Sequence, residues 1–376
     1  MKKLLYICPL IIFLMLACNS DDEDVNTDCD PLTEDCSEVN LTDIEYNPQP
    51  YNLEIPANFP PMEVPVDNAL TVDGVELGRH LFYDPILSAD STMSCSTCHM
   101  QSMSFTDNLA VSPGIDGIAG KRSSMSLLNV GFYYTGLFWD GRSTTLEEQA
   151  LLPVEDPIEL HTTWPNVIEK FKAHSSYPSM FRKAFGIESP DEITKELAAK
   201  AIAQFERIMI SSGKSRYDLV ESATPGMFYT EQELQGRDLY FDETDEHPGC
   251  SHCHTGALLT TNEYQNNGFQ DASSYEDYED KGHGLVTGNL VDNGKFRVPT
   301  LRNIEYTAPY MHDGSFSTLE EVIDHYAAGG FEAIGTNTLL TPFPITDEEK
   351  EALIAFIKTF SDQAFLDNPD LANPFE

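Results

Sequence analysis

Apolar residues recur at helical spacing in several parts of the chain, whereas few stretches alternate as a strand requires. The segment EEKEALIAFIKTF after Thr346 shows this most clearly, because its leucine, isoleucine and phenylalanine residues share one helical face. Thr346 is followed three residues later by Glu349, a pair that predicts where the helix begins. We therefore expect a mainly α-helical protein in which this helix packs on a core of the C-terminal half.

Other helix starts are marked in the same way, by a hydroxyl residue and a carboxylate three residues later. The pairs are Ser189 with Glu192, Thr230 with Glu233, and Ser317 with Glu320. In such capping boxes the two side chains satisfy backbone N–H groups that have no partner within the helix. Each pair predicts a helix that begins directly after its hydroxyl residue.

The two halves of the chain repeat one order of segments. The matching segments are ELGRHLFYD (76–84) with ELQGRDLYFD (233–242), RSSMSLLN (122–129) with RVPTLRN (297–303), and FWDGRSTTLEEQALLP (138–153) with MHDGSFSTLEEVIDHY (311–326). Such self-similarity indicates an internal duplication. It predicts two domains, 50–215 and 216–376, joined near residues 211–218.

Composition fits a folded protein of this size, since 41% of the 376 residues are apolar. The formal net charge is −40, with 62 acidic against 22 basic residues. This charge excludes nucleic acid as a partner, because phosphates need Lys and Arg for neutralisation. Two interpretations remain open: the charge keeps an exported protein soluble, or it attracts a cationic partner.

The N-terminus predicts export. Two lysines, an apolar run and a small residue directly before Cys18 form a secretory signal over residues 1–18. The cysteine at the cleavage point resembles a lipoprotein box, so we expect a lipid anchor on Cys18 and a periplasmic or cell-surface location. Residues 19–49 have the acidic composition of a flexible tether, in which Cys29 and Cys36 are placed to form a disulfide.

The other four cysteines after the signal fall in two identical frames. Cys95, Cys98 and His99 form CSTCH, and Cys250, Cys253 and His254 form CSHCH. Both are C-x-x-C-H motifs, in which two thiols attach to the vinyl groups of a haem c and the histidine binds its iron. The alternative is one structural zinc ion held by four thiolates.

Aligning the halves on the shared T-L-E-E letters places Tyr326 opposite Pro153, and His312 opposite Trp139. If this helix crosses the far side of each haem, the second iron meets a phenol and the first meets a proline that cannot bind it. We then expect one haem that reacts and one that stores electrons. Alternatively, Tyr326 is an ordinary core aromatic residue. The other candidates for the sixth ligand are Met311, His325 and His283, the last in a polar loop where we expect it to be solvated.

From Gly78 to Phe360 the chain resembles the bacterial di-haem cytochrome c peroxidase and MauG family. The residues that carry the resemblance are both C-x-x-C-H motifs, Leu128-Asn129, Phe138-Trp139-Asp140-Gly141-Arg142, Leu146-Glu147-Glu148-Gln149-Ala150, Pro153, Glu159, and Thr307-Ala308-Pro309-Tyr310-Met311-His312-Asp313-Gly314. The resemblance implies two cytochrome c-like domains with two covalently bound haem c groups, and hydrogen peroxide as oxidant.

The resemblance also implies roles for single residues. Trp139 matches a tryptophan between the haems that carries electrons or a radical, while Glu159 and Gln149 match polar groups over the open haem. Glu159 would move a proton between the peroxide oxygens. Tyr326 stands where MauG has a tyrosine ligand and other members have methionine.

Two departures from the family pattern concern metal ligands. Other members have a removable histidine in the loop after the first motif, but residues 100–138 contain no histidine. The haem of His99 should therefore be open without prior reduction, although Met100, Met103 and Met125 lie in this segment. The family implies calcium on the backbone carbonyls matching Thr307 and Pro309, but its asparagine ligand is replaced by Ser123.

Three functions follow as hypotheses. The leading one is a peroxidase that reduces hydrogen peroxide at the His99 haem, with electrons from a small donor protein relayed through the His254 haem and Trp139. The second is a MauG-like oxidase that uses peroxide to oxidise Trp or Tyr side chains of a partner protein. The third is a di-haem electron carrier that is not an enzyme.

Overall fold

The computed structural model describes residues 40–244 and 247–376, and residues 40–376 belong to one compact unit. The predicted signal peptide, Cys18, Cys29, Cys36 and residues 19–39 of the expected tether lie outside the described residues. Within the described ranges, no helix is both long enough and apolar enough to cross a membrane.

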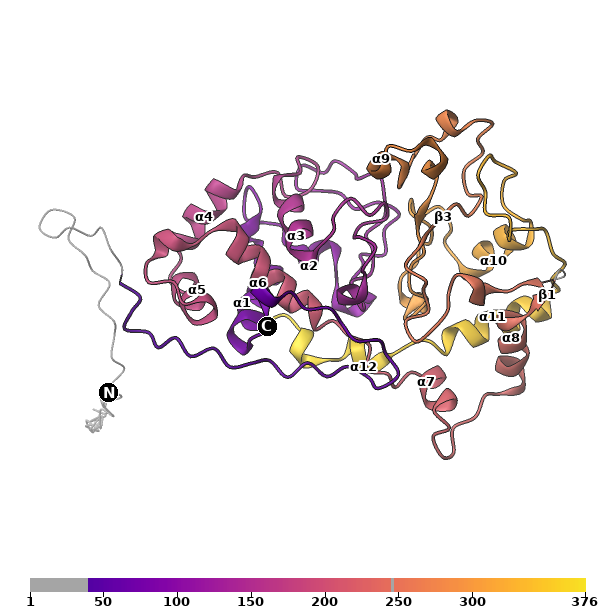
Figure 1. Ribbon diagram of the computed structural model, residues 1–376, viewed down its shortest axis with the longest axis horizontal. Coiled ribbons are helices and arrows are strands. Elements are labelled where there is room, and N and C mark those ends of the chain that lie inside the picture. Colours follow the sequence, from indigo (N-terminus) through magenta and orange to yellow (C-terminus); the bar gives the residue numbers. More distant parts are fainter. Residues whose placement is uncertain (1–39, 245–246) are drawn as a thin grey trace, which may run out of the picture. The chain divides into compact units, whose positions relative to one another are not determined.

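Helices dominate the described residues, which confirms the expected fold class (Figure 1). The α-helices are α1 (Val72–Tyr83), α2 (Cys95–Cys98), α3 (Leu146–Glu155), α4 (Trp164–Ala173), α5 (Tyr177–Phe185), α6 (Lys195–Arg207), α7 (Arg216–Glu221), α8 (Glu231–Phe241), α9 (Gly284–Thr287), α10 (Leu319–Ala327), α11 (Asp347–Lys358) and α12 (Gln363–Leu366). The strands are β1 (Glu243–Thr244), β2 (His247–Pro248), β3 (Tyr264–Gln265) and β4 (Phe296–Arg297), paired antiparallel as β1–β2 and β3–β4.

Two helix crossings organise the fold, α1 against α6 and α8 against α11. A glycine lies at each crossing. A Cβ atom on Gly78 would lie 1.9 Å from the carbonyl oxygen of Ala201, and one on Gly236 would lie 1.9 Å from that of Ala352. Both crossings therefore need glycine, because any side chain would force the helices apart.

Each crossing supports its own apolar core. In the first, Phe82, Phe105 and Phe205 are fully buried, and the ring of Phe82 contacts the other two edge to face. In the second, Tyr240 contacts Phe356 and Phe360 in the same manner. The apolar face predicted for α11 is buried, with Leu353, Ile354, Phe356, Ile357 and Phe360 in this core.

Three of the four predicted capping boxes are present at the expected residues, Ser189, Thr230 and Thr346. The prediction for Ser317 and Glu320 is wrong by one residue. The helix cap is Thr318, whose hydroxyl accepts from the N–H of Glu321, while the Glu321 carboxylate accepts from the N–H of Thr318 at 3.1 Å. Both frames fit the sequence, and the backbone adopts the one that starts α10 at Leu319.

Local geometry repeats between the halves. Asn129 and Asn303 both have left-handed backbones, with φ of 62° and 57°, and so do Phe138 and Met311, with φ of 62° and 73°. The loops that contain Phe138 and Met311 are each closed by an isolated antiparallel bridge, formed by Leu137 with Ser143 and by Tyr310 with Phe316. These repeats support the internal duplication and the division at residues 215 and 216, both of which stay proposals.

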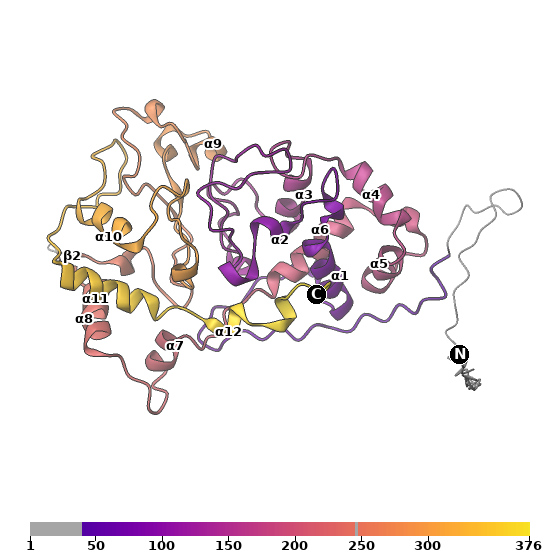
Figure 2. The same ribbon diagram turned by 180° about the vertical axis from the view of Figure 1, so that it is seen from behind.

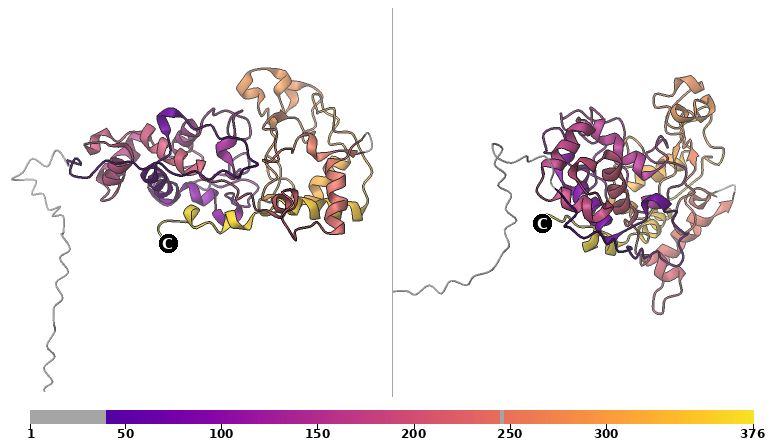
Figure 3. Two further views of the ribbon diagram at one scale, coloured as in Figure 1. Left: turned by 60° about the horizontal axis from the view of Figure 1, so that its bottom comes forward. Right: turned by 60° about the vertical axis from the view of Figure 1, so that its left-hand side comes forward.

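Chain segments far apart in the sequence join the two groups of helices (Figures 2 and 3). The segment with α12 leaves the C-terminal half and runs beneath the first group. There Phe365 contacts Phe105 edge to face, and the Tyr83 hydroxyl donates to the Leu371 carbonyl at 2.6 Å. The C-terminal segment thus helps to support the first C-x-x-C-H motif, which lies between α1 and residue 105.

Candidate functional site

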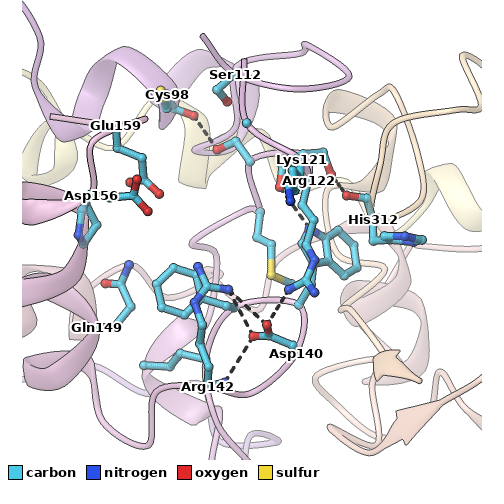
Figure 4. A pocket seen from close by; sticks show the side chains of 18 of the residues that line it. Cys98, Ser112, Lys121, Arg122, Asp140, Arg142, Gln149, Asp156, Glu159 and His312 are labelled. Atoms are coloured by element: carbon cyan, nitrogen blue, oxygen red, sulfur yellow. Dashed lines mark hydrogen bonds and ion pairs between the residues drawn. The ribbon is translucent and has the colours of Figure 1, made fainter. Parts of the chain in front are cut away.

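A cavity of about 1400 Å³ lies over the first C-x-x-C-H motif. Cys95, Cys98 and His99 line it, and α3 contributes Gln149 and Pro153. Figure 4 shows Gln149 and Glu159 pointing into the cavity from one wall, with Arg142, Asp140 and Arg122 across from them. This volume is large enough for a cofactor, because ordinary ligand pockets measure about 300–1,000 Å³.

His99 has one ring nitrogen engaged in a hydrogen bond and the other available for a metal. Its Nδ1 donates to the Phe105 carbonyl at 2.8 Å, which leaves Nε2 as the nitrogen with a lone pair. Burial lowers the pKa of the imidazole, although the Phe105 carbonyl opposes this, so the ring is neutral and able to bind a metal. The two thiols and the neutral imidazole of this motif fit the attachment of a haem c.

The second motif has the same construction. The Nδ1 of His254 donates to the Pro299 carbonyl at 3.1 Å, and burial lowers the pKa of the ring to about 4. The Tyr240 hydroxyl donates to the His254 carbonyl and holds the backbone of the motif. Cys250 and Cys253 are free thiols beside it, so these residues also fit a haem c.

The zinc alternative is wrong. Among the described residues, no group of three or more His, Cys, Asp or Glu side chains is placed to hold a metal ion. The two cysteine pairs belong to separate sites because each lies in its own half of the fold.

Glu159 lines the cavity and has a carboxyl with a shifted pKa. Burial raises the pKa of its carboxyl, the Asp156 carboxylate raises it further, and Arg142 lowers it. The guanidinium of Arg142 is held by Asp140 at 3.1 Å and lies 3.4 Å from the centre of the Phe138 ring. A carboxyl whose pKa is raised holds its proton to a higher pH than an ordinary glutamate, which suits a group that transfers protons.

Trp139 is fixed at the boundary of the two halves. Its indole Nε1 donates to the Ser123 carbonyl at 3.0 Å, and its own carbonyl accepts from the backbone N–H of Arg297 at 2.9 Å. Arg122 closes the same boundary by binding Asp140 of the first half at 2.6 Å and Asp280 of the second half at 2.7 Å. The tryptophan is thus anchored to both halves.

Tyr326 lies near Cys250 and Cys253, in α10. Burial raises the pKa of its phenol to about 12, and the only lowering contribution is the Asn267 side chain, whose Nδ2 lies 3.5 Å from the hydroxyl. The same Nδ2 donates to the Met311 sulfur at 3.3 Å, so Met311 stays an alternative ligand.

The other two ligand candidates are less suitable. His325 donates through Nε2 to the Asn267 carbonyl at 3.0 Å. His283 is half-buried, not solvated as expected, because its ring stacks on Tyr264 with centres 3.7 Å apart and its Nδ1 donates to the Asp140 carbonyl. The fold places this polar loop against the first half, a contact that composition could not predict.

The first cavity differs from the second site at the position of Tyr326. Pro153 of α3 lines the cavity and has no atom that binds iron. Of the methionines in the segment after His99, Met125 lines the cavity, but its sulfur accepts from Arg297 at 3.3 Å. Met100 and Met103 do not line the cavity: Met100 precedes a short 3-10 helix, Gln101–Met103, and Met103 ends it.

The residues expected around calcium are engaged with protein atoms. The Ser123 hydroxyl donates to the Met311 carbonyl at 3.1 Å, and the Thr307 hydroxyl donates to the Ile304 carbonyl at 3.2 Å. Pro309, two residues further along, is half-buried. Calcium on the carbonyls of Thr307 and Pro309 stays a prediction.

Glu206 of α6 is a buried acid that sequence reasoning missed. It lines the cavity, one carboxylate oxygen has no partner among the described residues, and burial raises its pKa to about 8. Nothing in the sequence signals this, because an adjacent Glu and Arg in a helix are ordinary surface residues.

Its pKa predicts how stability depends on pH. The folded protein holds this proton up to about pH 8, whereas an unfolded glutamate releases it near 4.5, so stability falls as pH rises through this window. We expect Glu206→Gln to melt about 5 °C higher than the parent protein at pH 9, with little difference at pH 4.5. Thermal melts of both proteins measure this, with the exposed Glu196→Gln of the same helix as control. If the parent protein and both variants showed the same dependence of melting temperature on pH, the raised pKa of Glu206 would be refuted.

Comparison with known proteins supports one family. Residues 72–223 match the di-haem cytochrome c peroxidase family. The chain is 33% identical over 349 residues to cytochrome-c peroxidase IdrP1 of Pseudomonas sp. (strain SCT), a match that covers 85% of this chain and 89% of that protein. It is 32% identical over 297 residues to the methylamine utilization protein MauG of Methylorubrum extorquens, covering 78% of this chain and 80% of that protein.

A solved structure agrees with these matches. The crystal structure of a MauG-like protein associated with microbial copper homeostasis superposes with a TM-score of 0.80 at 35% identity, covering 87% of this chain and 100% of that chain. Members of the family are periplasmic di-haem proteins, which use hydrogen peroxide and a protein partner. The chain therefore belongs to the di-haem cytochrome c peroxidase family, which includes MauG, and is an oxidoreductase that acts on peroxide.

Proposed function

We propose that the protein reduces hydrogen peroxide in the cavity of His99, with electrons that reach it through the site of His254 and through Trp139. The observation that carries this proposal is the difference between α3 and α10. Pro153 lines the first cavity and has no atom that could bind an iron, whereas Tyr326 would offer a phenol to an iron held by the second motif. One site then binds the oxidant and the other exchanges electrons.

The residues of the first site have separate roles in holding the haem and in handling peroxide. Cys95 and Cys98 would attach the haem, and the Nε2 of His99 would bind its iron. When bound, the haem supplies an iron with a free coordination position and the redox chemistry of peroxide reduction. The chain then has to position peroxide and move protons.

Glu159 is suited to the proton transfer. Its carboxylate would take the proton from one peroxide oxygen and donate it to the other, which leaves as water. Gln149 lies on the same wall and has an amide that can hold peroxide by hydrogen bonds. Arg142 limits how far the pKa of Glu159 rises, so the carboxyl can also lose its proton.

A second candidate function is the oxidation of Trp or Tyr side chains in a partner protein, as in MauG. The position of Tyr326 favours it, because a phenolate ligand would stabilise an oxidised iron at the second site. The similarity to the MauG-like protein at 35% identity favours it as well. In this case the electrons withdrawn through Trp139 would come from the partner, not from a small donor protein.

The location is inferred from the N-terminus. An exported protein anchored by lipid at Cys18 fits the periplasmic location of family members. Calcium at Thr307 and Pro309 would be an additional bound ion.

The spin states of the two irons test whether one site binds the oxidant while the other exchanges electrons. Electron paramagnetic resonance of the oxidised protein should show one high-spin and one low-spin haem, because only one iron has six ligands. Two low-spin signals would contradict the open site and leave an electron carrier. Steady-state turnover with peroxide and a reduced small cytochrome then separates the two enzymes, since a protein oxidase should consume this donor poorly.

Replacing the phenol tests the second site. In Tyr326→Phe the low-spin signal should change its g-values or become high-spin, because the ring stays and the ligand oxygen is lost. Met311→Leu is the matched control, since Met311 shares the Asn267 side chain with Tyr326. If the phenylalanine variant kept the parent spectrum and the leucine variant lost it, the ligand would be Met311.

A further inference from the structure

Arg297 belongs to the C-terminal half but lines the cavity of the first half. It is the last residue of β4, next to the segment whose Pro299 carbonyl binds His254. Its exposed fraction is 2%, and its side chain lies in the cavity lining together with His99 and Cys98. The lining does not include Cys250, Cys253 or His254.

The side-chain contacts of this guanidinium come from the first half and carry no negative charge. Nη2 donates to the Met125 sulfur at 3.3 Å, Nε lies 3.4 Å from the Phe138 carbonyl, and the group stacks 3.7 Å from the centre of the Tyr133 ring. Nη1 is buried and has no partner among the described residues. A sulfur, a long carbonyl contact and a ring do not balance a buried positive charge.

The other arginines in comparable positions have carboxylate partners. Arg207 binds both oxygens of Glu147 at 2.7 and 2.9 Å, and Arg302 binds both oxygens of Asp218 at 2.8 and 2.7 Å. Arg122, which the duplication aligns with Arg297, binds Asp140 and Asp280. Arg297 therefore differs from all three in lacking a carboxylate, and its free N–H belongs to a residue that lines the cavity.

We propose that Arg297 binds a carboxylate of the group held in the His99 cavity, which for a haem c is a propionate. The inference rests on the proposed haem at His99. If so, the first site is complete only when the second half of the chain supplies Arg297. The backbone N–H of Arg297 also donates to the Trp139 carbonyl, so one residue would position both the tryptophan and the propionate.

This contact has a redox consequence. A positive charge bonded to a propionate offsets its negative charge and so favours the reduced iron, which carries one positive charge less than the oxidised iron. Removing it should weaken the reduced state of the His99 haem about tenfold, which corresponds to a potential lower by 59 mV for one electron. The His254 haem should change far less.

The test is a spectroelectrochemical titration of the complete two-haem protein with Arg297→Gln. Arg237→Gln is the control, because it removes one positive charge from the surface of α8 in the same half. We expect the high-spin haem to shift to lower potential in Arg297→Gln only. An unchanged high-spin potential would overturn the proposal, and so would a shift confined to the low-spin haem, which would assign the carboxylate to the second site.

Two further arms complete the test. If Arg297→Gln does not assemble with two haems, Arg297→Met takes its place. It also removes the charge and leaves an apolar side chain that can fill the space, so it should give a shift of the same sign, and no shift would refute the contact. A parent potential that depends on added chloride or phosphate would also refute it, because a free anion would then occupy the site. Two low-spin haems would defeat the proposed function alone, and the proposal for Arg297 would then be judged by whether one of the two potentials falls in Arg297→Gln while neither falls in Arg237→Gln.

Discussion

Glu159→Gln is expected to slow the reaction of the oxidised protein with hydrogen peroxide by about 10²–10⁴-fold, the usual contribution of a positioned acid–base group. Glutamine keeps the size and polarity of the side chain but cannot take a proton from one peroxide oxygen and return it to the other. Stopped-flow absorption after mixing with peroxide measures the rate directly. The haem spectra before mixing should match those of the parent protein, because Glu159 is not an expected ligand.

The pH dependence of this rate gives an independent check. Burial and Asp156 raise the pKa of Glu159, so the parent rate should titrate above the usual range of a glutamate, and the variant should lose this transition. Glu155→Gln is a suitable control, since Glu155 ends α3 but is exposed. A variant at Glu159 that reacts as fast as this control would remove the residue from the mechanism.

Asp218→Asn is expected to lower the free energy of unfolding by about 3–5 kcal/mol, the usual cost of removing one partner of a buried ion pair. Arg302 is fully buried, and its guanidinium binds both oxygens of Asp218 while its Nε donates to the Ala257 carbonyl at 2.7 Å. Asparagine would leave the charge of Arg302 without compensation. Denaturant or thermal unfolding of the two-haem protein measures the loss.

The ion pair of Asp218 and Arg302 also predicts that the protein loses stability at low pH. Burial alone would raise the pKa of Asp218, but the bonds from Arg302 and Ser215 outweigh it and hold the pKa below its usual value. The stability from this pair is therefore present above about pH 4 and lost as pH falls through the lower folded pKa, and Asp218→Asn should abolish that contribution.

Two comparisons make the result specific. Asp191→Asn breaks an exposed pair with Lys172 and should cost less than about 1 kcal/mol. The double variant Asp218→Leu with Arg302→Met removes both charges and should recover most of the loss, because apolar residues can replace a buried ion pair. If Asp218→Asn were no less stable than Asp191→Asn, the pair would not support the fold.

The parts of the fold that depend on residues close together in the chain could be predicted from the sequence. Three of four capping boxes and the buried face of α11 were placed correctly, because caps and helical faces follow from spacings of three or four residues. The box at Thr318 was placed one residue too early, since Ser317 and Thr318 both have a glutamate at the right distance.

The prediction of the site rests on chemistry that requires a fixed local spacing. The two C-x-x-C-H motifs alone predicted where the haems attach. The internal repeat aligned Pro153 of the first half with Tyr326 of the second. Whether Tyr326 or Met311 binds the second iron was not decided by spacing. Both side chains reach Asn267, which lies in a different part of the chain.

The sequence by itself determined the helical fold class, and it contains the two C-x-x-C-H motifs and the alignment of Pro153 with Tyr326, because each depends on residues a few positions apart. Only the tertiary structure decided that Arg297 enters the cavity of the other half, that Glu206 is buried with its proton, and that His283 stacks on Tyr264. Burial and charge pairing depend on which distant segments the fold brings together. No local pattern contains that information.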